Sequence, residues 1–178
     1  MSSVIAAYPA LARAAVTRAL AGQAAPDPLD IDPDPALWQP RRACFVTLKN
    51  PGLRGCIGSI HPARENLGQE IIANALAAAG RDPRFPPLAR EELAGVLFSV
   101  DVLSEPEPVS DQSELDPARW GVIVSQGGRR GLLLPDLPGV DSAARQVAIA
   151  AQKAGITDLG GLDLQRFSVD RHPEPGPG

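Results

Sequence analysis

Cysteine is scarce in this chain: only Cys44 and Cys56 occur among its 178 residues. Two thiols are too few for the disulfide framework of a small secreted domain, so we expect a protein of the reducing cytoplasm. Long apolar runs are also missing, since no stretch approaches the roughly 18 uncharged apolar residues of a membrane span. Residues 1–20 lack a positively charged region before an apolar core, which argues against a secretory signal. We therefore expect a cytoplasmic protein without a membrane partner.

Positive charge is not in excess either. The 17 Lys and Arg residues face 21 Asp and Glu residues, which gives a net charge of -4 and an isoelectric point near 5.2. A nucleic-acid-binding domain would instead carry a basic patch, so we expect no nucleic-acid partner. The two histidines, His61 and His172, are far apart in the sequence, and no CxxC or HxxxH spacing occurs. The sequence therefore predicts neither a metal site nor a bound cofactor.

Proline and glycine are abundant, with 19 and 17 residues, and they divide the chain into short elements. Apolar residues at helical spacing predict three helices, and β-branched or alternating segments predict six strands. The helices are expected over residues 9–21, 65–80 and 142–155, and the strands over 43–49, 53–60, 95–104, 120–126, 129–135 and 163–172. Tight turns join two pairs of these strands into antiparallel hairpins. The order favours an α+β fold, with an antiparallel or mixed sheet and flanking helices, over a doubly wound parallel sheet.

Other segments predict connections between these elements. Alternating Asp and Pro in residues 23–40 predict an extended connector, because proline forbids a regular helix there. The proline-rich residues 173–178 predict a disordered tail. The rigid turn at residues 81–85 and the loop at residues 104–118 are the expected seams between two lobes with a cleft between them.

The most informative stretch is LRGCIGSI, in which Cys56 lies between Gly55 and Gly58. Glycine inside a strand is costly unless it allows another group to approach closely, so this backbone is expected to be open to a ligand. Strand alternation places Arg54 and Cys56 on one face, where they could share a pocket wall. The neighbouring positive charge would favour the thiolate that a nucleophile requires.

The same residues allow a second interpretation. Cysteine is small and often buried, so Cys56 could be a packing residue, with the glycines serving only a tight hairpin. Arg84 could bring a second cation to the thiol, or it could simply pair with Asp82 in the same turn. Two hypotheses therefore stay open: an enzyme or enzyme subunit that uses Cys56, and a non-catalytic module that presents this surface to a partner.

Several segments in this order resemble the AMMECR family. They are LRGCIGS at residues 53–59, DPRFPPL at 82–88, EEL at 91–93, LFSVDVLSEPEPV at 97–109 and GLLLP at 131–135, within a match over about residues 9–172. The segments WGVIVSQGGRRGLLLPDLPGVDS and QVAIAAQKAGI are similar to the protein A type of AmmeMemoRadiSam systems. In those systems the domain occurs beside a Memo-like protein and a radical SAM protein.

The resemblance implies one AMMECR-type domain over residues 1–178, with an α+β fold in two lobes and the RGCIG segment lining the cleft. It also implies a Memo-like protein and a radical SAM protein as partners. Together with the residue chemistry, it predicts Cys56 as the candidate catalytic residue. The residues expected around an unknown small-molecule ligand are Arg54, Gly55, Gly58, Ser59 and Arg84.

Overall fold

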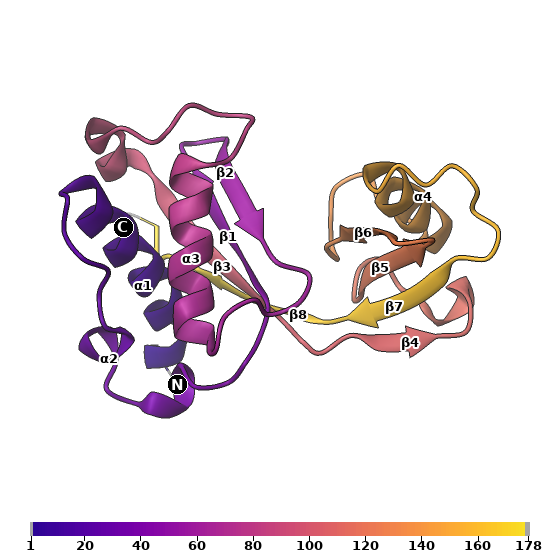
Figure 1. Ribbon diagram of the computed structural model, residues 1–178, viewed down its shortest axis with the longest axis horizontal. Coiled ribbons are helices and arrows are strands. Elements are labelled where there is room, and N and C mark those ends of the chain that lie inside the picture. Colours follow the sequence, from indigo (N-terminus) through magenta and orange to yellow (C-terminus); the bar gives the residue numbers. More distant parts are fainter. Residues whose placement is uncertain (1, 177–178) are drawn as a thin grey trace. The chain divides into compact units, whose positions relative to one another are not determined.

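The computed structural model describes residues 2–176, which divide into two compact units (Figure 1). Unit 1 contains the chain up to Val102 and the segment from Arg171 onward, and unit 2 contains Leu103–Asp170. Each unit has one four-stranded sheet with helices packed on it, which confirms the predicted α+β class. The predicted seam at residues 104–118 lies within unit 2 and begins just after the observed boundary between Val102 and Leu103. The predicted seam at residues 81–85 is wrong, because that turn lies inside unit 1.

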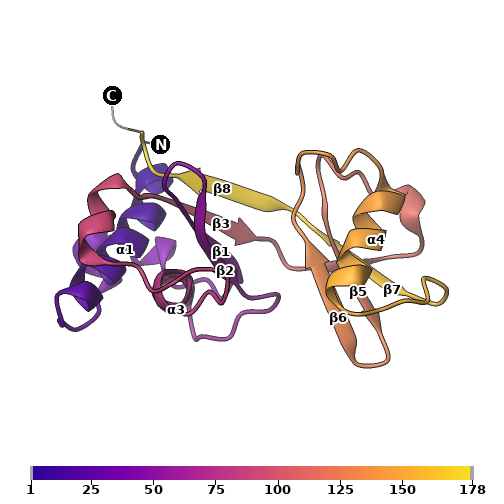
Figure 2. The same cartoon turned by 90° about the horizontal axis from the view of Figure 1, so that it is seen from above.

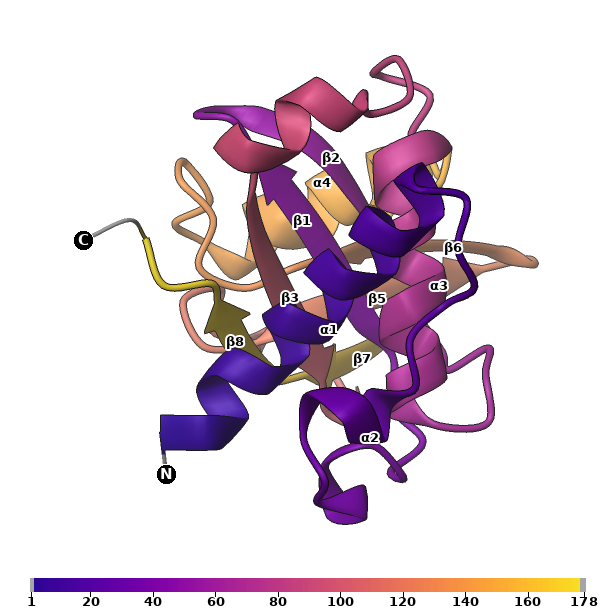
Figure 3. The same cartoon turned by 90° about the vertical axis from the view of Figure 1, so that its left-hand side faces the viewer.

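Unit 1 packs its two long helices on one face of a sheet with the strand order β2-β1-β3-β8 (Figure 3). Its elements are α1 (Ser2–Leu20), α2 (Pro28–Ile31), η1 (Pro35–Leu37), β1 (Cys44–Lys49), β2 (Leu53–Gly58), α3 (Leu67–Gly80), η2 (Arg90–Gly95), β3 (Leu97–Leu103) and β8 (Val169–Pro173). Helix α1 begins well before the predicted residue 9 and continues through Pro9. Ala7 and Tyr8 are buried in the core, so tertiary packing outweighs the local effect of the proline.

Alternation along β1 separates the two faces of this sheet. Cys44, Val46 and Leu48 are fully buried against the helices, whereas Phe45 and Thr47 are only half-buried. Burial of each large apolar side chain contributes about 1.5–3 kcal/mol, which is why the helix face fixes the register. The opposite face therefore presents the polar and half-buried residues, and the candidate site lies there.

The predicted extended connector at residues 23–40 contains two short helical segments, α2 and η1. Asp27 and Asp34 cap them, because each carboxylate accepts a backbone N–H two residues further on. A proline follows each cap, at the first helical position, where no N–H is required. Trp38 is buried and anchors this segment to the core of unit 1.

Unit 2 has the strand order β4-β7-β5-β6, and α4 packs on β5 and β6 (Figure 2). Its elements are β4 (Glu107–Val109), η3 (Gln112–Glu114), β5 (Gly121–Gln126), β6 (Arg129–Leu133), α4 (Ala143–Lys153) and β7 (Asp163–Phe167). The predicted hairpin around Gly127 and Gly128 is confirmed, and both glycines have positive φ. The predicted loop at residues 104–118 contains β4, which pairs with β7.

The predicted strand at residues 163–172 is two strands in two different sheets, β7 and β8. The change occurs at Ser168, whose N–H donates to Oγ of Ser104 at 2.8 Å. In return, the N–H of Ser104 donates to the carbonyl of Ser168 at 2.9 Å. The outgoing and returning segments of the chain are thus bonded to each other beside the boundary between the units.

The predicted disordered tail begins too early. Pro173 ends β8, and the N–H of Glu174 donates to the carbonyl of Phe98 at 2.8 Å, so the pairing with β3 continues through Glu174. Residues 177–178 of that predicted tail lie outside the described residues. Within residues 2–176, every helix is too short or too polar to cross a membrane.

Candidate functional site

Cys56 lies on β2, at the edge of the sheet of unit 1, directly opposite Thr47 on β1. The two side chains share the face that points away from the helices. The hydroxyl of Thr47 lies 3.3 Å from the sulfur of Cys56 and donates a hydrogen bond to it. Cys56 is half-buried, so its thiol is neither a core residue nor a fully exposed one.

The two glycines beside Cys56 allow two close approaches on opposite faces of β2. A Cβ atom on Gly55 would lie 2.3 Å from the carbonyl oxygen of Ala78, so β2 packs directly on the backbone of α3. A Cβ atom on Gly58 would lie 2.3 Å from the ring of Phe45. The sequence led us to expect a ligand close to these two glycines. In the structure, the close neighbours are other groups of the protein itself.

Asp82 and Arg84 hold the backbone of Cys56 at the outer edge of β2. The N–H of Cys56 donates to Oδ2 of Asp82 at 3.0 Å, and Nη2 of Arg84 donates to the carbonyl of Cys56 at 3.2 Å. The two side chains also pair with each other through Nη2 and Oδ2 at 2.7 Å. We call this arrangement the Asp82–Arg84 clasp. It joins the RGCIG and DPRF segments at one residue.

The hydrogen bonds of the clasp keep the carboxylate of Asp82 charged although it is buried. The side chain of Asp82 is 1% exposed, whereas that of Arg84 is 54% exposed. Hydrogen bonds from the Arg84 guanidinium, and then from the backbone N–H groups of Cys56 and Arg84, hold the pKa of Asp82 well below its usual range. Asp82 therefore stays ionised at all ordinary pH values.

Arg54 is held in a second ion pair. Its Nε and Nη2 donate to the two carboxylate oxygens of Glu92 at 2.9 and 3.0 Å. This bidentate contact, with help from the N–H of Ala89, lowers the pKa of Glu92 to about 2. Phe85 lies near both arginines, with its ring 5.9 Å from the guanidinium of Arg54 and 5.6 Å from that of Arg84. The structure thus brings Arg54 and Arg84 together around one aromatic ring, each paired with an acid.

Ser59 is bound to Glu70, which lies on α3. The hydroxyl of Ser59 donates to Oε1 of Glu70 at 2.6 Å, and the N–H groups of Ala63 and Arg64 donate to Oε2. Glu70 is 1% exposed. These contacts fix the loop that follows the motif, so the position of Ser59 has a structural explanation.

The other cysteine has a different environment. Cys44 is fully buried, and burial raises the pKa of its thiol to about 12. Asn74 donates to its carbonyl and lies 3.4 Å from its sulfur. Cys44 is therefore a neutral core residue, which makes it an internal reference for the reactivity of Cys56.

Sequence reasoning missed Thr47, Glu70 and Glu92, and it considered Asp82 only as a simple partner for Arg84. The others depend on strand register or on the packing of α3 and η2 against β2, and the linear sequence carries no direct signal for either. Across residues 2–176, no three His, Cys, Asp or Glu side chains gather closely enough to hold a metal ion.

Comparisons with known proteins show which proteins this chain is similar to. The family model described as AMMECR1 matches residues 9–172. The chain belongs to the AMMECR1 family. A Thermotoga maritima protein is 51% identical over 149 residues, which cover 80% of this chain and 86% of that relative. The crystal structure of an uncharacterized protein from Pyrococcus horikoshii is similar, with a TM-score of 0.80 and 30% identity over 92% of this chain and 88% of that one.

The AMMECR1 domain also occurs within a longer protein. A Clostridium acetobutylicum protein is 47% identical over 135 residues, which cover 75% of this chain but only 29% of that relative. This chain therefore spans less than a third of the Clostridium protein. None of these three proteins is named for an activity.

Proposed function

We propose that the surface around Cys56 binds a small-molecule ligand or substrate, and that the Cys56 thiol reacts with it or is itself modified. The observation that carries this proposal is the Asp82–Arg84 clasp. An ion pair with a buried carboxylate holds both backbone groups of Cys56, while the residue itself is only half-buried. A cysteine that only fills space would not require such backbone restraint, whereas a reacting group benefits from a fixed position.

The chemistry that fits is displacement at an electrophilic carbon that carries a leaving group. The sulfur forms a C–S bond, the bond to the leaving group breaks, and the thiol proton passes to water. The hydrogen bond from Thr47 to the sulfur stabilises negative charge there. Arg84 is exposed and contacts the carbonyl of Cys56, so it is the cation best placed to meet an anionic group of the ligand.

We further infer that the chain works within a Memo-like and radical-SAM-associated system. This inference rests on the likeness of residues 120–142 to the protein A type of those systems. Co-purification of the full chain with a Memo-like protein and with a radical SAM protein tests it. We expect retention of at least one of them, and retention of neither would contradict the inference.

Selective alkylation tests the role of Cys56. Iodoacetamide at neutral pH, followed by mass spectrometry of the peptides, should label Cys56 at least about tenfold faster than Cys44, since Cys44 is fully buried and its burial raises the pKa of its thiol to about 12. Cys56→Ser should abolish the fast phase and leave the slow labelling of Cys44 unchanged. Equal rates, or faster labelling of Cys44, would make Cys56 a packing residue.

One observation favours a non-catalytic binding module as the second candidate. Arg54 and Arg84 are both committed to carboxylates, so their charges are largely balanced within the protein. Around them, Pro86 and Pro87 are exposed and offer a rigid surface to a partner protein. Under this alternative, Cys56→Ser would leave partner binding intact, whereas a bulky substitution such as Pro86→Trp would weaken it.

A further inference from the structure

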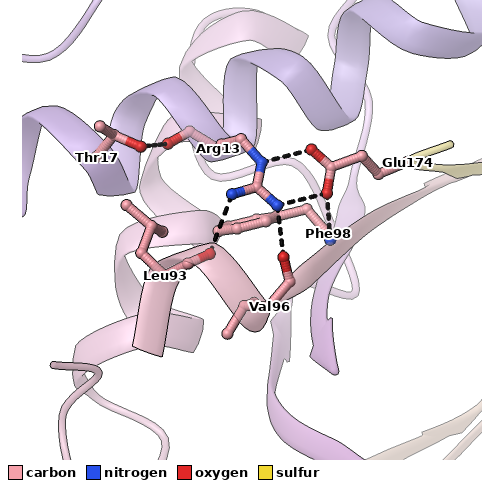
Figure 4. A network of polar contacts seen from close by, with 6 residues as sticks. All are labelled: Arg13, Thr17, Leu93, Val96, Phe98 and Glu174. Carbon is pink, nitrogen blue, oxygen red and sulfur yellow. Dashed lines mark hydrogen bonds and ion pairs between the residues drawn. The ribbon is translucent and has the colours of Figure 1, made fainter. Parts of the chain in front are cut away.

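Arg13 on α1 forms a bidentate ion pair with Glu174, which lies 161 positions later in the sequence (Figure 4). Nε of Arg13 donates to Oε1 at 2.5 Å, and Nη2 donates to Oε2 at 2.7 Å. The backbone N–H of Phe98 donates to the same Oε2 at 3.1 Å. Three N–H groups from two elements therefore converge on one carboxylate.

The guanidinium of Arg13 is also held by groups other than Glu174. Nη1 donates to the carbonyl of Leu93 at 3.2 Å, and Nη2 donates to the carbonyl of Val96 at 2.5 Å. The guanidinium carbon lies 4.8 Å from the centre of the Phe98 ring. These contacts orient the fork of donors whether or not a carboxylate is present, because none of them involves the tail.

Solvent can reach this arrangement. A cavity of about 550 Å³ adjoins it and is lined by residues from α1, the β1–β2 turn, η2 and the tail. Both Arg13 and Glu174 line this cavity, as does the exposed Lys49. A small anion could therefore enter beside the ion pair without disturbing the hydrophobic core.

We propose that Arg13 and the N–H of Phe98 form a pre-organised binding site for a carboxylate, and that Glu174 is an occupant supplied by the chain itself. When the tail is withdrawn, the site takes a small organic carboxylate. While Glu174 is bound, it latches the end of β8 to β3, because its own N–H pairs with the carbonyl of Phe98.

The donor pattern selects a carboxylate. One oxygen receives one N–H and the other receives two, which matches the planar, two-oxygen geometry that an arginine fork recognises. Two further N–H groups of Arg13 already donate to the carbonyls of Leu93 and Val96. The site therefore presents a limited set of donors to one flat, singly charged group.

Glu174→Ala empties the site and allows a direct test with acetate. We expect the backbone amide resonance of Phe98 to shift saturably as acetate is added to the variant, against sodium chloride at equal ionic strength. Wild type should show no such shift, because the tethered Glu174 has a high effective concentration. Glu174→Ala combined with Arg13→Met should also show none. A shift of equal size in wild type, or no saturable shift in Glu174→Ala, would overturn the proposal.

Thermal unfolding provides a second test in case Glu174→Ala is too unstable for spectroscopy. Acetate should raise the melting temperature of Glu174→Ala by about 2–4 °C relative to chloride. Glu107→Ala is the matched control, since it removes an ion pair with Arg166 that has no such cradle of donors. If acetate raised the melting temperature of Glu107→Ala equally, or that of Glu174→Ala not at all, the carboxylate site would be refuted.

Discussion

The N–H of Cys56 donates to the carboxylate of Asp82 at 3.0 Å, although 26 positions separate the two residues in the sequence. This bond covers the open edge of β2 at the one residue whose thiol is the candidate reacting group. An uncovered strand edge invites pairing with other chains, so the contact protects the site as well as positioning it.

Removing the carboxylate of the clasp should destabilise unit 1. Asp82→Ala leaves the N–H of Cys56 and the guanidinium of Arg84 without their shared acceptor, so we expect a loss of about 2–4 kcal/mol in the free energy of unfolding. Chemical denaturation measures this loss. The control Glu107→Ala breaks an exposed pair and should cost at most about 1 kcal/mol. Equal losses in the two variants would show that the clasp is no stronger than a surface pair.

The ion pair between Arg54 and Glu92 should give unit 1 a defined sensitivity to acid. Glu92 has a pKa of about 2 in the folded chain, against an ordinary value of 4.5. Because the folded value is the lower one, the stabilisation is complete above pH 4.5 and is lost as the pH falls through 2. The difference in unfolding free energy between wild type and Glu92→Gln should therefore narrow over this range. A difference independent of pH would contradict the assignment.

The hydroxyl of Thr47 should promote the reaction of Cys56 with alkylating reagents. Thr47→Val keeps the shape of the side chain but removes the donor to the sulfur, so we expect labelling to slow by roughly three- to tenfold. Thr47→Ser keeps a hydroxyl and should stay closer to wild type. Rates of iodoacetamide labelling, measured by mass spectrometry, compare the three proteins. An unchanged rate in Thr47→Val would remove Thr47 from the site.

Gly55 should tolerate no side chain. In Gly55→Ala the new methyl group would lie 2.3 Å from the carbonyl oxygen of Ala78, and a backbone atom in a packed helix cannot move aside cheaply. We expect a loss of about 3 kcal/mol in the free energy of unfolding. Gly52→Ala is the matched control, because a Cβ atom there meets no neighbour within 4 Å. Similar stability of the two variants would mean that α3 can shift away from β2.

The sequence alone was enough to predict the hairpin of β1 and β2, and it offered the pairing of Arg84 with Asp82 as one of two alternatives. Alternating apolar residues and the Asn-Pro-Gly turn specify the hairpin locally, and the two charged residues are only two positions apart. The pairing of Arg54 with Glu92 depends on how η2 packs beside β2, so no local pattern reports it. The expected effect of Arg54 on the reactivity of the Cys56 thiol stays a prediction. In the structure, the guanidinium of Arg54 is paired with the carboxylate of Glu92.

The division of residues 163–172 into two strands was beyond local reasoning as well. Both halves have strand-like composition, and the sequence does not show that they belong to different sheets. What separates them is the bonding of Ser168 to Ser104, a contact between segments 64 positions apart. Long-range contacts of this kind decide which sheet a strand joins.

The chain leaves unit 1 once, after Val102, and returns to it once, at Arg171. Beside these two points, Nε of Arg171 donates to Oδ1 of Asp101 at 3.1 Å, so the exit and the re-entry are neighbours. In terms of domain architecture, unit 2 is one continuous insertion between the adjacent strands β3 and β8, and unit 1 is the host domain. Every contact named above for the Cys56 site belongs to the host, so an excised chain joined by a short turn from Val102 to Arg171 would retain the complete set.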